Sequence, residues 1–256
     1  KPKNKFMLLK NHWKKSNALR KSNILISCFI NKLLIALIKF GTGRVDITNY
    51  GHSSLLIKGG GQSILINPFK AVGCASGLKE PRLKVNVILA SSELADEGAK
   101  VAQGKFLVKP GSYRIQGKSY EGFAVAHDRL GGRRFGQATV WQWEQGGLTF
   151  AHMGGSASAL TAIEKVLLGR PDVLIIAVGG GEKVFNGIEA ARVVRNLKPK
   201  RVIPVQFLGI NSPDKCELTG VQPFLDAMNG ITVEEVGKTL TLSNRISENT
   251  VINILR

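Results

Sequence analysis

The chain has 256 residues, of which 43% are hydrophobic and 21% are charged, and its formal net charge at pH 7 is +18. This length is enough to bury one large core, and the composition excludes a wholly disordered chain. The cysteines, Cys28, Cys74 and Cys216, are widely spaced and include no C-x-x-C pair. We therefore expect neither a disulfide framework nor a structural zinc site, and we expect a reducing, cytoplasmic compartment.

The first 42 residues form a leader that differs from the rest in charge. They hold ten Lys or Arg and no acidic residue, which leaves 26 basic against 18 acidic side chains in residues 43–256. Nucleic acid would therefore be attracted mainly by this leader. Residues 24–38 are apolar, but Asn31 and Lys32 interrupt them, so the run is short for a membrane span. The run could form an amphipathic helix that targets or anchors the chain at a membrane, or the leader could be an extension that the natural protein lacks.

Beyond the leader, short strands alternate with glycine-rich turns, and most of the helices follow residue 150. Alternating or continuous apolar runs bounded by turn residues predict strands at 45–50, 55–57, 63–66, 87–90, 105–108, 120–126, 139–143, 148–151, 172–177, 201–205 and 232–235. Longer segments predict helices at 93–101, 157–168, 187–197 and 221–228.

Residues 87–98 carry the most informative motif. An apolar run, Val-Ile-Leu-Ala, is followed by Ser-Ser-Glu-Leu-Ala-Asp-Glu-Gly. This segment resembles that of metallo-β-lactamase-fold hydrolases, in which a strand is followed by Thr-His-x-His-x-Asp-His. On that pattern Ser92 and Leu94 stand at two histidines, while Asp96 stands at the aspartate and Glu97 at the last histidine. Imidazole and carboxylate hold zinc in such enzymes, whereas serine is a poor ligand and leucine is none.

Further segments extend the resemblance over residues 45–242. They contain, in chain order, Gly-His-Ser-Ser with His52, Ile-Leu-Ile-Asn-Pro with Asn67, Phe-Ala-Val-Ala-His with His127, His-Met-Gly-Gly with Gly155, and Ile-Pro-Val-Gln with Gln206. On the family pattern Gly155 replaces the carboxylate that bridges two metal ions, and Gln206 replaces the final histidine. The resemblance implies an α/β (α+β) fold, a four-layer αββα sandwich in a single domain, 43–256. It is closest in wording to the ascorbate-phosphate-lactonase-like, Zn-dependent hydrolase-like branch and to cyanobacterial members.

Of the family's metal ligands only Asp96 and His127 remain. The resemblance therefore implies a protein without a metal or other cofactor, which binds a small anionic ligand or a protein partner and does not catalyse a reaction. Two alternatives stay open. A metal-dependent hydrolase of the lactonase or phosphodiesterase type could hold zinc or another divalent ion on an altered site made of Asp96, Glu97, His127 and Asp128. An RNA-processing relative is the second alternative, although it would lack the full histidine set.

Other residues near the expected cleft have plainer interpretations. The acidic residues at 96 and 97 also suit the start of the helix predicted at 93–101, because a helix N-terminus favours negative charge. His152 on an apolar strand is typical of a core histidine, and His52 follows glycine in a turn. The loop just past the third motif carries a basic cluster that could clamp an anion at the mouth of the cleft, namely Arg129, Arg133 and Arg134.

Overall fold

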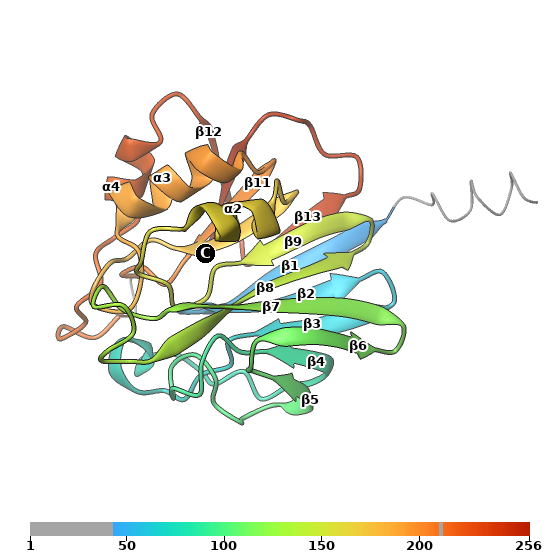
Figure 1. The fold of residues 1–256 in the computed structure, drawn as a ribbon, viewed down its shortest axis with the longest axis horizontal. Coiled ribbons are helices and arrows are strands. Elements are labelled where there is room, and N and C mark those ends of the chain that lie inside the picture. Colours follow the sequence, from blue (N-terminus) through green and yellow to red (C-terminus); the bar gives the residue numbers. More distant parts are fainter. Residues whose placement is uncertain (1–42, 210–211) are drawn as a thin grey trace, which may run out of the picture. The chain divides into compact units, whose positions relative to one another are not determined.

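The structure is a computed structural model that describes residues 43–209 and 212–256, so the predictions made for the leader lie outside the described residues. Residues Gly43–Arg256 form one compact unit. Two mixed β-sheets pack face to face in this unit, with α-helices on the outside of one of them (Figure 1). No helix in the described part of the chain is long and apolar enough to cross a membrane.

The smaller sheet has six strands in the order β13-β1-β2-β3-β4-β5. Strands β1, β2 and β3 pair antiparallel, while β3, β4 and β5 pair parallel. Inward-facing side chains such as Val45 and Ile47 are fully buried between the two sheets, since successive side chains of a strand point to opposite faces. The strands are β1 (Arg44–Gly51), β2 (Ser54–Gly59), β3 (Gln62–Ile66), β4 (Lys84–Leu89), β5 (Gln103–Leu107) and β13 (Thr239–Ser243).

The larger sheet has eight strands in the order β12-β14-β11-β10-β9-β8-β7-β6, and β9, β10 and β11 are parallel at its centre. Every residue of β10 is buried, because Ile175 faces the other sheet while Leu174 and Ile176 face the helices. The strands are β6 (Gly111–Ile115), β7 (Lys118–Ala126), β8 (Gln137–Gln145), β9 (Leu148–His152), β10 (Val173–Ala177), β11 (Arg201–Val205), β12 (Thr232–Val236) and β14 (Val251–Leu255).

The α-helices of the described residues, α2 (Ala162–Leu168), α3 (Gly187–Leu197) and α4 (Gln222–Ala227), cover the outer face of the larger sheet. Helix α3 begins at a capping box, in which Asn186 and Glu189 each accept a hydrogen bond from the other's backbone N–H. The outer face of the smaller sheet packs instead against Leu83 and Ala102, which lie in no helix.

The predicted α/β sandwich of two packed sheets is confirmed, but among the described residues α-helices cover only the larger sheet, so the outer helical layer of the four-layer αββα arrangement is not seen on the smaller one. Several elements also differ from the prediction. The prediction missed β6, β13 and β14. The helix predicted at 93–101 is wrong, because this segment forms turns in which the backbone N–H groups of Glu97 and Gly98 both donate to the carbonyl oxygen of Leu94. Helix α2 starts five residues later than predicted, because Thr161 caps it and the preceding stretch is not helical.

One edge of the sandwich collects the residues that the sequence singled out. Strands β3, β4, β7, β9 and β11 all run toward this edge, and each is followed there by one of the predicted positions, in that order Asn67, Ser92, His127, Gly155 and Gln206. The carboxyl ends of parallel strands form the usual binding edge of an α/β sheet. The fold therefore gathers these positions although they are far apart in the sequence.

Candidate functional site

Glu97 lies at the centre of this edge, and its side chain is completely buried. Its carboxylate accepts hydrogen bonds from the hydroxyl groups of Ser91 and Ser92, both at 3.1 Å, and from Nε2 of Gln206 at 3.4 Å. Nε2 of His127 lies 3.1 Å from Glu97 Oε2. The carboxylate therefore contacts residues that follow strands of both sheets.

These contacts keep Glu97 ionised. Burial alone would raise the pKa of Glu97, but the contact with His127 and the positive charge of Lys183 outweigh burial, and the pKa lies below its usual value. Hydrogen bonds donated to a carboxylate act in the same direction, since they favour the charged form. His152, at the end of β9, is also buried, and burial lowers its pKa from 6.5 to about 4 against the opposing charge of Glu97. His152 is thus a neutral core histidine near pH 7.

Gly155 faces the carboxylate of Glu97. A Cβ atom at this position would lie 2.6 and 2.7 Å from the two Glu97 carboxylate oxygens, and closer still to Nε2 of His127. Real Cβ atoms do not approach other atoms so closely, so the buried Glu97 requires glycine here. An aspartate at position 155, which the family pattern places there, cannot fit while Glu97 keeps its place.

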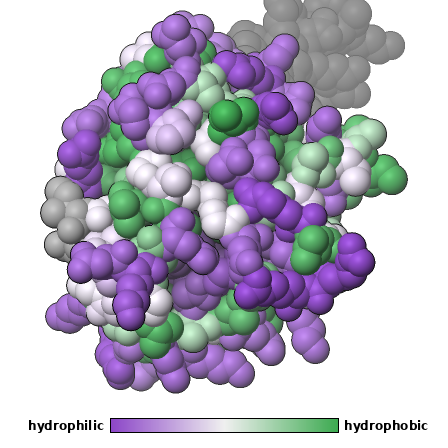
Figure 2. Space-filling model, turned by 90° about the vertical axis from the view of Figure 1, so that its left-hand side faces the viewer, coloured by the Kyte–Doolittle hydropathy of each residue, from purple (hydrophilic) through white to green (hydrophobic). Residues whose placement is uncertain are grey.

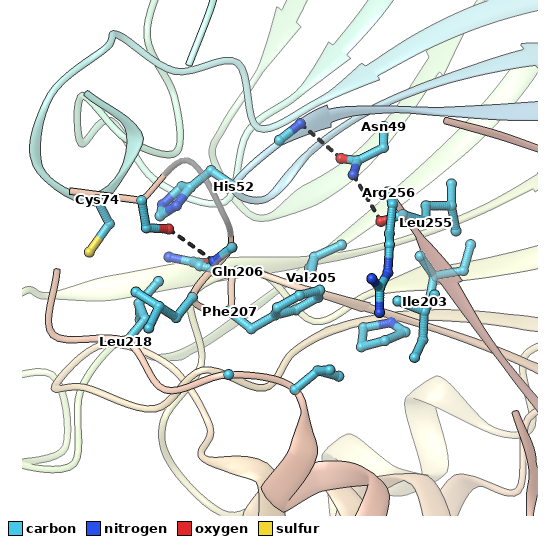
Figure 3. Close-up of a pocket in the computed structure, with 18 of the residues that line it drawn as sticks. Asn49, His52, Cys74, Ile203, Val205, Gln206, Phe207, Leu218, Leu255 and Arg256 are labelled. Atoms are coloured by element: carbon cyan, nitrogen blue, oxygen red, sulfur yellow. Dashed lines mark hydrogen bonds between the residues drawn. The ribbon is translucent and has the colours of Figure 1, made fainter. Parts of the chain in front are cut away.

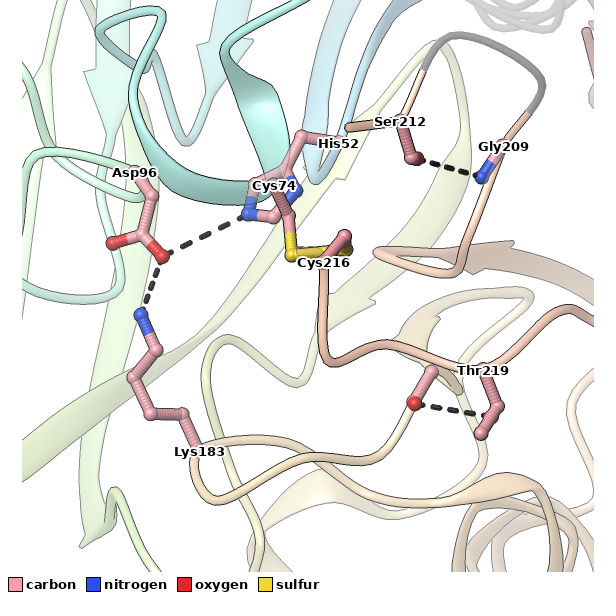
Figure 4. Close-up of a disulfide and its surroundings, with 9 residues drawn as sticks. His52, Cys74, Asp96, Lys183, Gly209, Ser212, Cys216 and Thr219 are labelled. Atoms are coloured by element: carbon pink, nitrogen blue, oxygen red, sulfur yellow. Dashed lines mark hydrogen bonds and ion pairs between the residues drawn. A yellow bond between two sulfur atoms is a disulfide. The ribbon is translucent and has the colours of Figure 1, made fainter. Parts of the chain in front are cut away.

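Asp96 faces a cation from another loop. Its carboxylate forms an ion pair with the ammonium group of Lys183 and lies 3.8 Å from Nε2 of His52 (Figure 4). Burial would raise the pKa of Asp96, but His52 and Lys183 hold the pKa well below its usual value. Sequence reasoning missed Lys183. It follows the Gly-Gly-Gly turn after β10, and the arrival of β10 at the same edge is the signal that could have identified it.

Asn67 supports the site indirectly, through hydrogen bonds with Ser91. Its side chain donates to Ser91 Oγ at 2.9 Å and accepts from the backbone N–H of Ser91, and the hydroxyl group of Ser91 in turn donates to Glu97. Asn67, His52 and Gln206 all have left-handed backbone conformations, with φ of 39°, 52° and 52°. Such conformations are costly for residues other than glycine and cluster at functional sites. The N–H of Gln206 also donates to the carbonyl oxygen of His52, which joins the two strained turns across the sheets.

Two candidate residues have structural contacts instead. The carboxylate of Asp128 accepts hydrogen bonds from four backbone N–H groups of the following loop, and these bonds, chiefly the one from Phe135, lower its pKa. Asp128 therefore shapes its own loop. Leu94 contributes its backbone to the turn that precedes Glu97, with its N–H donating to Ser92 Oγ.

The basic loop after β7 lies near the edge, but two of its arginines are paired with carboxylates. Arg129 forms an ion pair with Glu189 at 2.6 Å and also donates to the backbone carbonyl oxygens of Gly181 and Val184, and Arg134 pairs with Glu182. Arg133 donates to the carbonyl oxygen of Leu130 within its own loop. The charges of Arg129 and Arg134 are thus balanced inside the protein, which weakens the argument for an anion clamp.

Cys74 and Cys216 form a disulfide, which the wide spacing of the cysteines did not lead us to expect (Figure 4). The two residues are 142 positions apart in the sequence, but their Cα atoms are only 4.8 Å apart. Cys74 follows β3 in a short 3-10 helix, η1 (Gly73–Ala75), and Cys216 follows β11, so the fold brings the two loops together. Disulfides are typical of oxidising environments, so the cysteines no longer support a reducing compartment.

Two cavities open at this edge on either side of Gln206. The first, which we call the polar chamber, has a volume of about 620 Å³ and includes Asp96, Lys183, Asp214, Lys215 and Glu217 in its wall. The second, the apolar chamber, has a volume of about 470 Å³ and is walled mainly by Leu55, Ile203, Val205, Phe207 and Leu218 (Figure 3). Both chambers share His52, Cys74, Gln206 and Leu218.

The donor groups do not fit the two-metal centre of the family pattern. Within residues 43–209 and 212–256 no group of three or more His, Cys, Asp and Glu side chains is placed to hold a metal ion. Asp96 is paired with Lys183, the carboxylate of Glu97 is already hydrogen-bonded, and Gly155 offers no bridging carboxylate. A catalytic zinc site normally uses three protein ligands. No metal-dependent step follows from these residues.

Comparisons with known proteins agree with the fold. Among solved structures, a candidate zinc-dependent hydrolase of the metallo-β-lactamase superfamily from Thermotoga maritima is 25% identical with a TM-score of 0.67, and the match covers 83% of this chain and 100% of that one. The metallo hydrolase Igni18 from Ignicoccus hospitalis is 17% identical, with a TM-score of 0.55 and coverage of 78% and 98%. An isothiocyanate hydrolase from Delia radicum gut bacteria is 12% identical, with a TM-score of 0.56 and coverage of 81% and 95%.

The comparison with curated protein sequences gave no significant match. The family profile described as the beta-lactamase superfamily domain matches residues 46–206. This match spans more than half of the chain and includes every strand end that builds the site. The chain therefore belongs to the beta-lactamase superfamily, with the metallo-β-lactamase fold.

Proposed function

We propose that this chain is a non-hydrolytic member of the superfamily, which binds a ligand in the cleft at the strand ends. The proposal rests on one observation above all, the buried carboxylate of Glu97, which is held by Ser91, Ser92 and Gln206 and faces His127. The hydrogen bonds donated by these groups stabilise the buried carboxylate without an added cation.

The pair of Asp96 and Lys183 supports the same proposal. In the family pattern Asp96 is a metal ligand, whereas here an ammonium group of the chain itself neutralises it. To bind a metal, Asp96 would first have to release Lys183, which also lies near the aromatic ring of Phe135. Protein side chains thus supply both the positive and the negative charges at this edge.

The cavities favour a small molecule over a protein partner. Ligand pockets usually have volumes of about 300–1,000 Å³, and both chambers fall within this range. Figure 2 shows one face of the molecule, on which apolar residues lie singly or in small groups among hydrophilic ones. On this face, the described residues do not form the larger continuous apolar patch that is common at protein-binding surfaces.

A metal-dependent hydrolase with an altered site is the second candidate. It is favoured by Nε2 of His127, which is buried beside Glu97 without a well-aligned hydrogen bond, and by the buried Oε1 of Gln206, which has no partner. These two atoms and Glu97 could act as ligands if the hydroxyl groups of Ser91 and Ser92 moved aside, and Asp96 could join them if it released Lys183. The names of the similar solved structures, which include metallo hydrolases, agree with this alternative.

Elemental analysis of protein purified without chelator separates the two candidates. We expect well under one zinc, manganese or iron ion per chain, and no metal-dependent hydrolysis of p-nitrophenyl acetate, bis(p-nitrophenyl) phosphate or γ-butyrolactone. The matched variants are His127→Ala, which removes the retained ligand, and His152→Ala, which removes another buried histidine of the same edge. Stoichiometric metal and hydrolysis that are lost together in His127→Ala, but kept in His152→Ala, would establish the altered-site hydrolase instead.

A further inference from the structure

Helix α2 exposes an apolar side to solvent. The side chains of Ile163, Val166 and Leu167 are 73%, 81% and 47% exposed, and spacings of three and four residues place them on one side of the helix. Four of the eight large hydrophobic side chains that are exposed among the described residues lie on two adjacent helices, namely these three and Ile188 of α3. Single apolar side chains are normal on a surface, but a group on one side of a helix indicates that something covers it.

The charge beside this apolar group is positive. Arg192 and Arg195 of α3 are exposed and stand four and seven positions after Ile188, so they share its side of the helix. Lys165 is the exposed cation of α2. Both helices lie on the outer face of the larger sheet (Figure 1), and we call their exposed side the helical face.

The carboxylates of the two helices do not compensate this charge. Glu164 of α2 and Glu189 of α3 each accept a backbone hydrogen bond in the capping box of their helix, and Glu189 also pairs with Arg129 at 2.6 Å. The ion pairs of residues 43–209 and 212–256 include none of the three cations of the helical face. The face therefore combines exposed apolar side chains with positive charge that its own acidic residues leave free.

This combination disfavours a protein partner of the same kind. A symmetric dimer through the helical face would bring its cations close to the same cations of the second copy, and like charges across an interface are unfavourable. The apolar group consists of a few side chains, which is small for a protein-binding patch. A lipid surface makes a smaller demand, because apolar side chains enter the boundary between headgroups and acyl chains while cations attract anionic headgroups.

We propose that the helical face binds an anionic lipid surface. Ile163, Val166 and Leu167 enter the headgroup boundary, and Arg192 and Arg195 contact the headgroups. The protein would lie on the membrane, since no helix of the described residues is long and apolar enough to cross it. No residue of α2 or α3 lines either chamber, so this inference is independent of the ligand that the cleft binds.

Flotation of the full chain with lipid vesicles at low ionic strength tests the inference. Vesicles of equal parts phosphatidylglycerol and phosphatidylcholine should bind the protein at least about tenfold more tightly than vesicles of phosphatidylcholine alone, because only the former attract the cations. Absence of binding to the anionic vesicles, or equal binding to both kinds, would overturn the inference.

Matched variants locate the binding surface. Val166→Asp should weaken binding to the anionic vesicles by at least about tenfold, whereas Val72→Asp, the same change at a valine that is 45% exposed after β3, should bind like the wild type. Arg192→Glu on α3 and Arg114→Glu at an exposed position of β6 form a second pair with the same expected contrast, which serves if Val166→Asp does not fold. The basic leader is present in every variant, so binding through the leader alone would leave all four equal to the wild type and would contradict the placement.

An uncharged variant separates lipid from nucleic acid. Replacing Ile163, Val166 and Leu167 by serine keeps every charge, and it should weaken vesicle binding by at least about tenfold. Nucleic acid is attracted by cations and does not need these apolar side chains. Binding to duplex DNA that Arg192→Glu weakens and the serine variant keeps, without binding to vesicles, would assign the helical face to nucleic acid and refute the lipid surface.

Discussion

Glu97 and a side chain at position 155 exclude each other. This exclusion can be measured as the coupling free energy between substitutions of Glu97 and Gly155. Gly155→Ala places a Cβ atom 2.6 and 2.7 Å from the carboxylate oxygens of Glu97, and neither Glu97 nor His127 has solvent into which it could move. Overpacking of this kind costs about 1–3 kcal/mol. Loss of glycine entropy in the unfolded chain stabilises by only about 0.4–1 kcal/mol, so a net loss of free energy of unfolding is expected.

The double variant makes the test specific. Glu97→Ala alone should be destabilising, because it leaves His127, Ser91 and Ser92 without their common partner. In that background Gly155→Ala should cost less, since the methyl group no longer meets the carboxylate and its nearest neighbour, Nε2 of His127, can shift into the space that the carboxylate has left. The coupling between the two substitutions should be about 1–3 kcal/mol and favourable.

Urea unfolding at pH 7, followed by tryptophan fluorescence, measures all three variants against the wild type. Gly155→Ala alone should also lower the melting temperature by about 2–4 °C per kcal/mol in a domain of this size. The control is Gly237→Ala, where an added Cβ meets no atom within 4 Å, and it should leave stability unchanged or slightly higher. The reasoning is refuted if Gly155→Ala is as stable as Gly237→Ala, or if Glu97→Ala does not relieve its cost.

Three further predictions concern the surroundings of the site. Replacing both Cys74 and Cys216 by serine should lower the free energy of unfolding by about 4–5 kcal/mol, since the disulfide closes a loop between residues 142 positions apart. Dithiothreitol should bring the wild type to the same urea midpoint as this variant and leave the variant itself unchanged. Burial lowers the pKa of His152 in the folded chain to about 4, against 6.5 ordinarily, so between these pH values only the unfolded chain binds a proton at this histidine. The free energy of unfolding should therefore fall by roughly 3 kcal/mol as the pH drops from 6.5 to 4. A His152→Asn variant that shows the same fall would contradict this. Lys183→Met should cost roughly 1–3 kcal/mol by leaving Asp96 without its cation, and adding Asp96→Asn should recover most of that loss in the same urea assay.

The fold was predictable because its signals are local. Each strand that ends at the site carries its own apolar run, and the motif residues follow these runs directly, as His127 follows β7 and Gln206 follows β11. One edge strand was harder to predict. Strand β6 keeps most of its side chains exposed, so its sequence contains little of the apolar pattern on which the prediction depends. Strands β13 (Thr-Leu-Thr-Leu-Ser) and β14 (Val-Ile-Asn-Ile-Leu) do carry that pattern and could have been predicted from it.

The contacts of the site were not predictable, because they depend on long-range packing. Acidic residues at 96 and 97 are equally typical of a helix start, and only the turn at Leu94 directs Glu97 inward toward Gly155. The approach of Lys183 and the pairing of the cysteines join segments that are 87 and 142 residues apart. Sequence spacing carries no information about such pairs until the order of strands in the sheets is known.

The disulfide has a mechanical consequence for the cleft. Cys74 belongs to the loop after β3, in the smaller sheet, and Cys216 to the loop after β11, in the larger sheet, so the bond crosslinks the two halves of the sandwich at the edge where both chambers open. With Cα atoms 4.8 Å apart, these loops cannot separate to admit a bulky molecule between them. Entry must then occur beside the bond, and reduction of the bond would remove this restraint on the two loops.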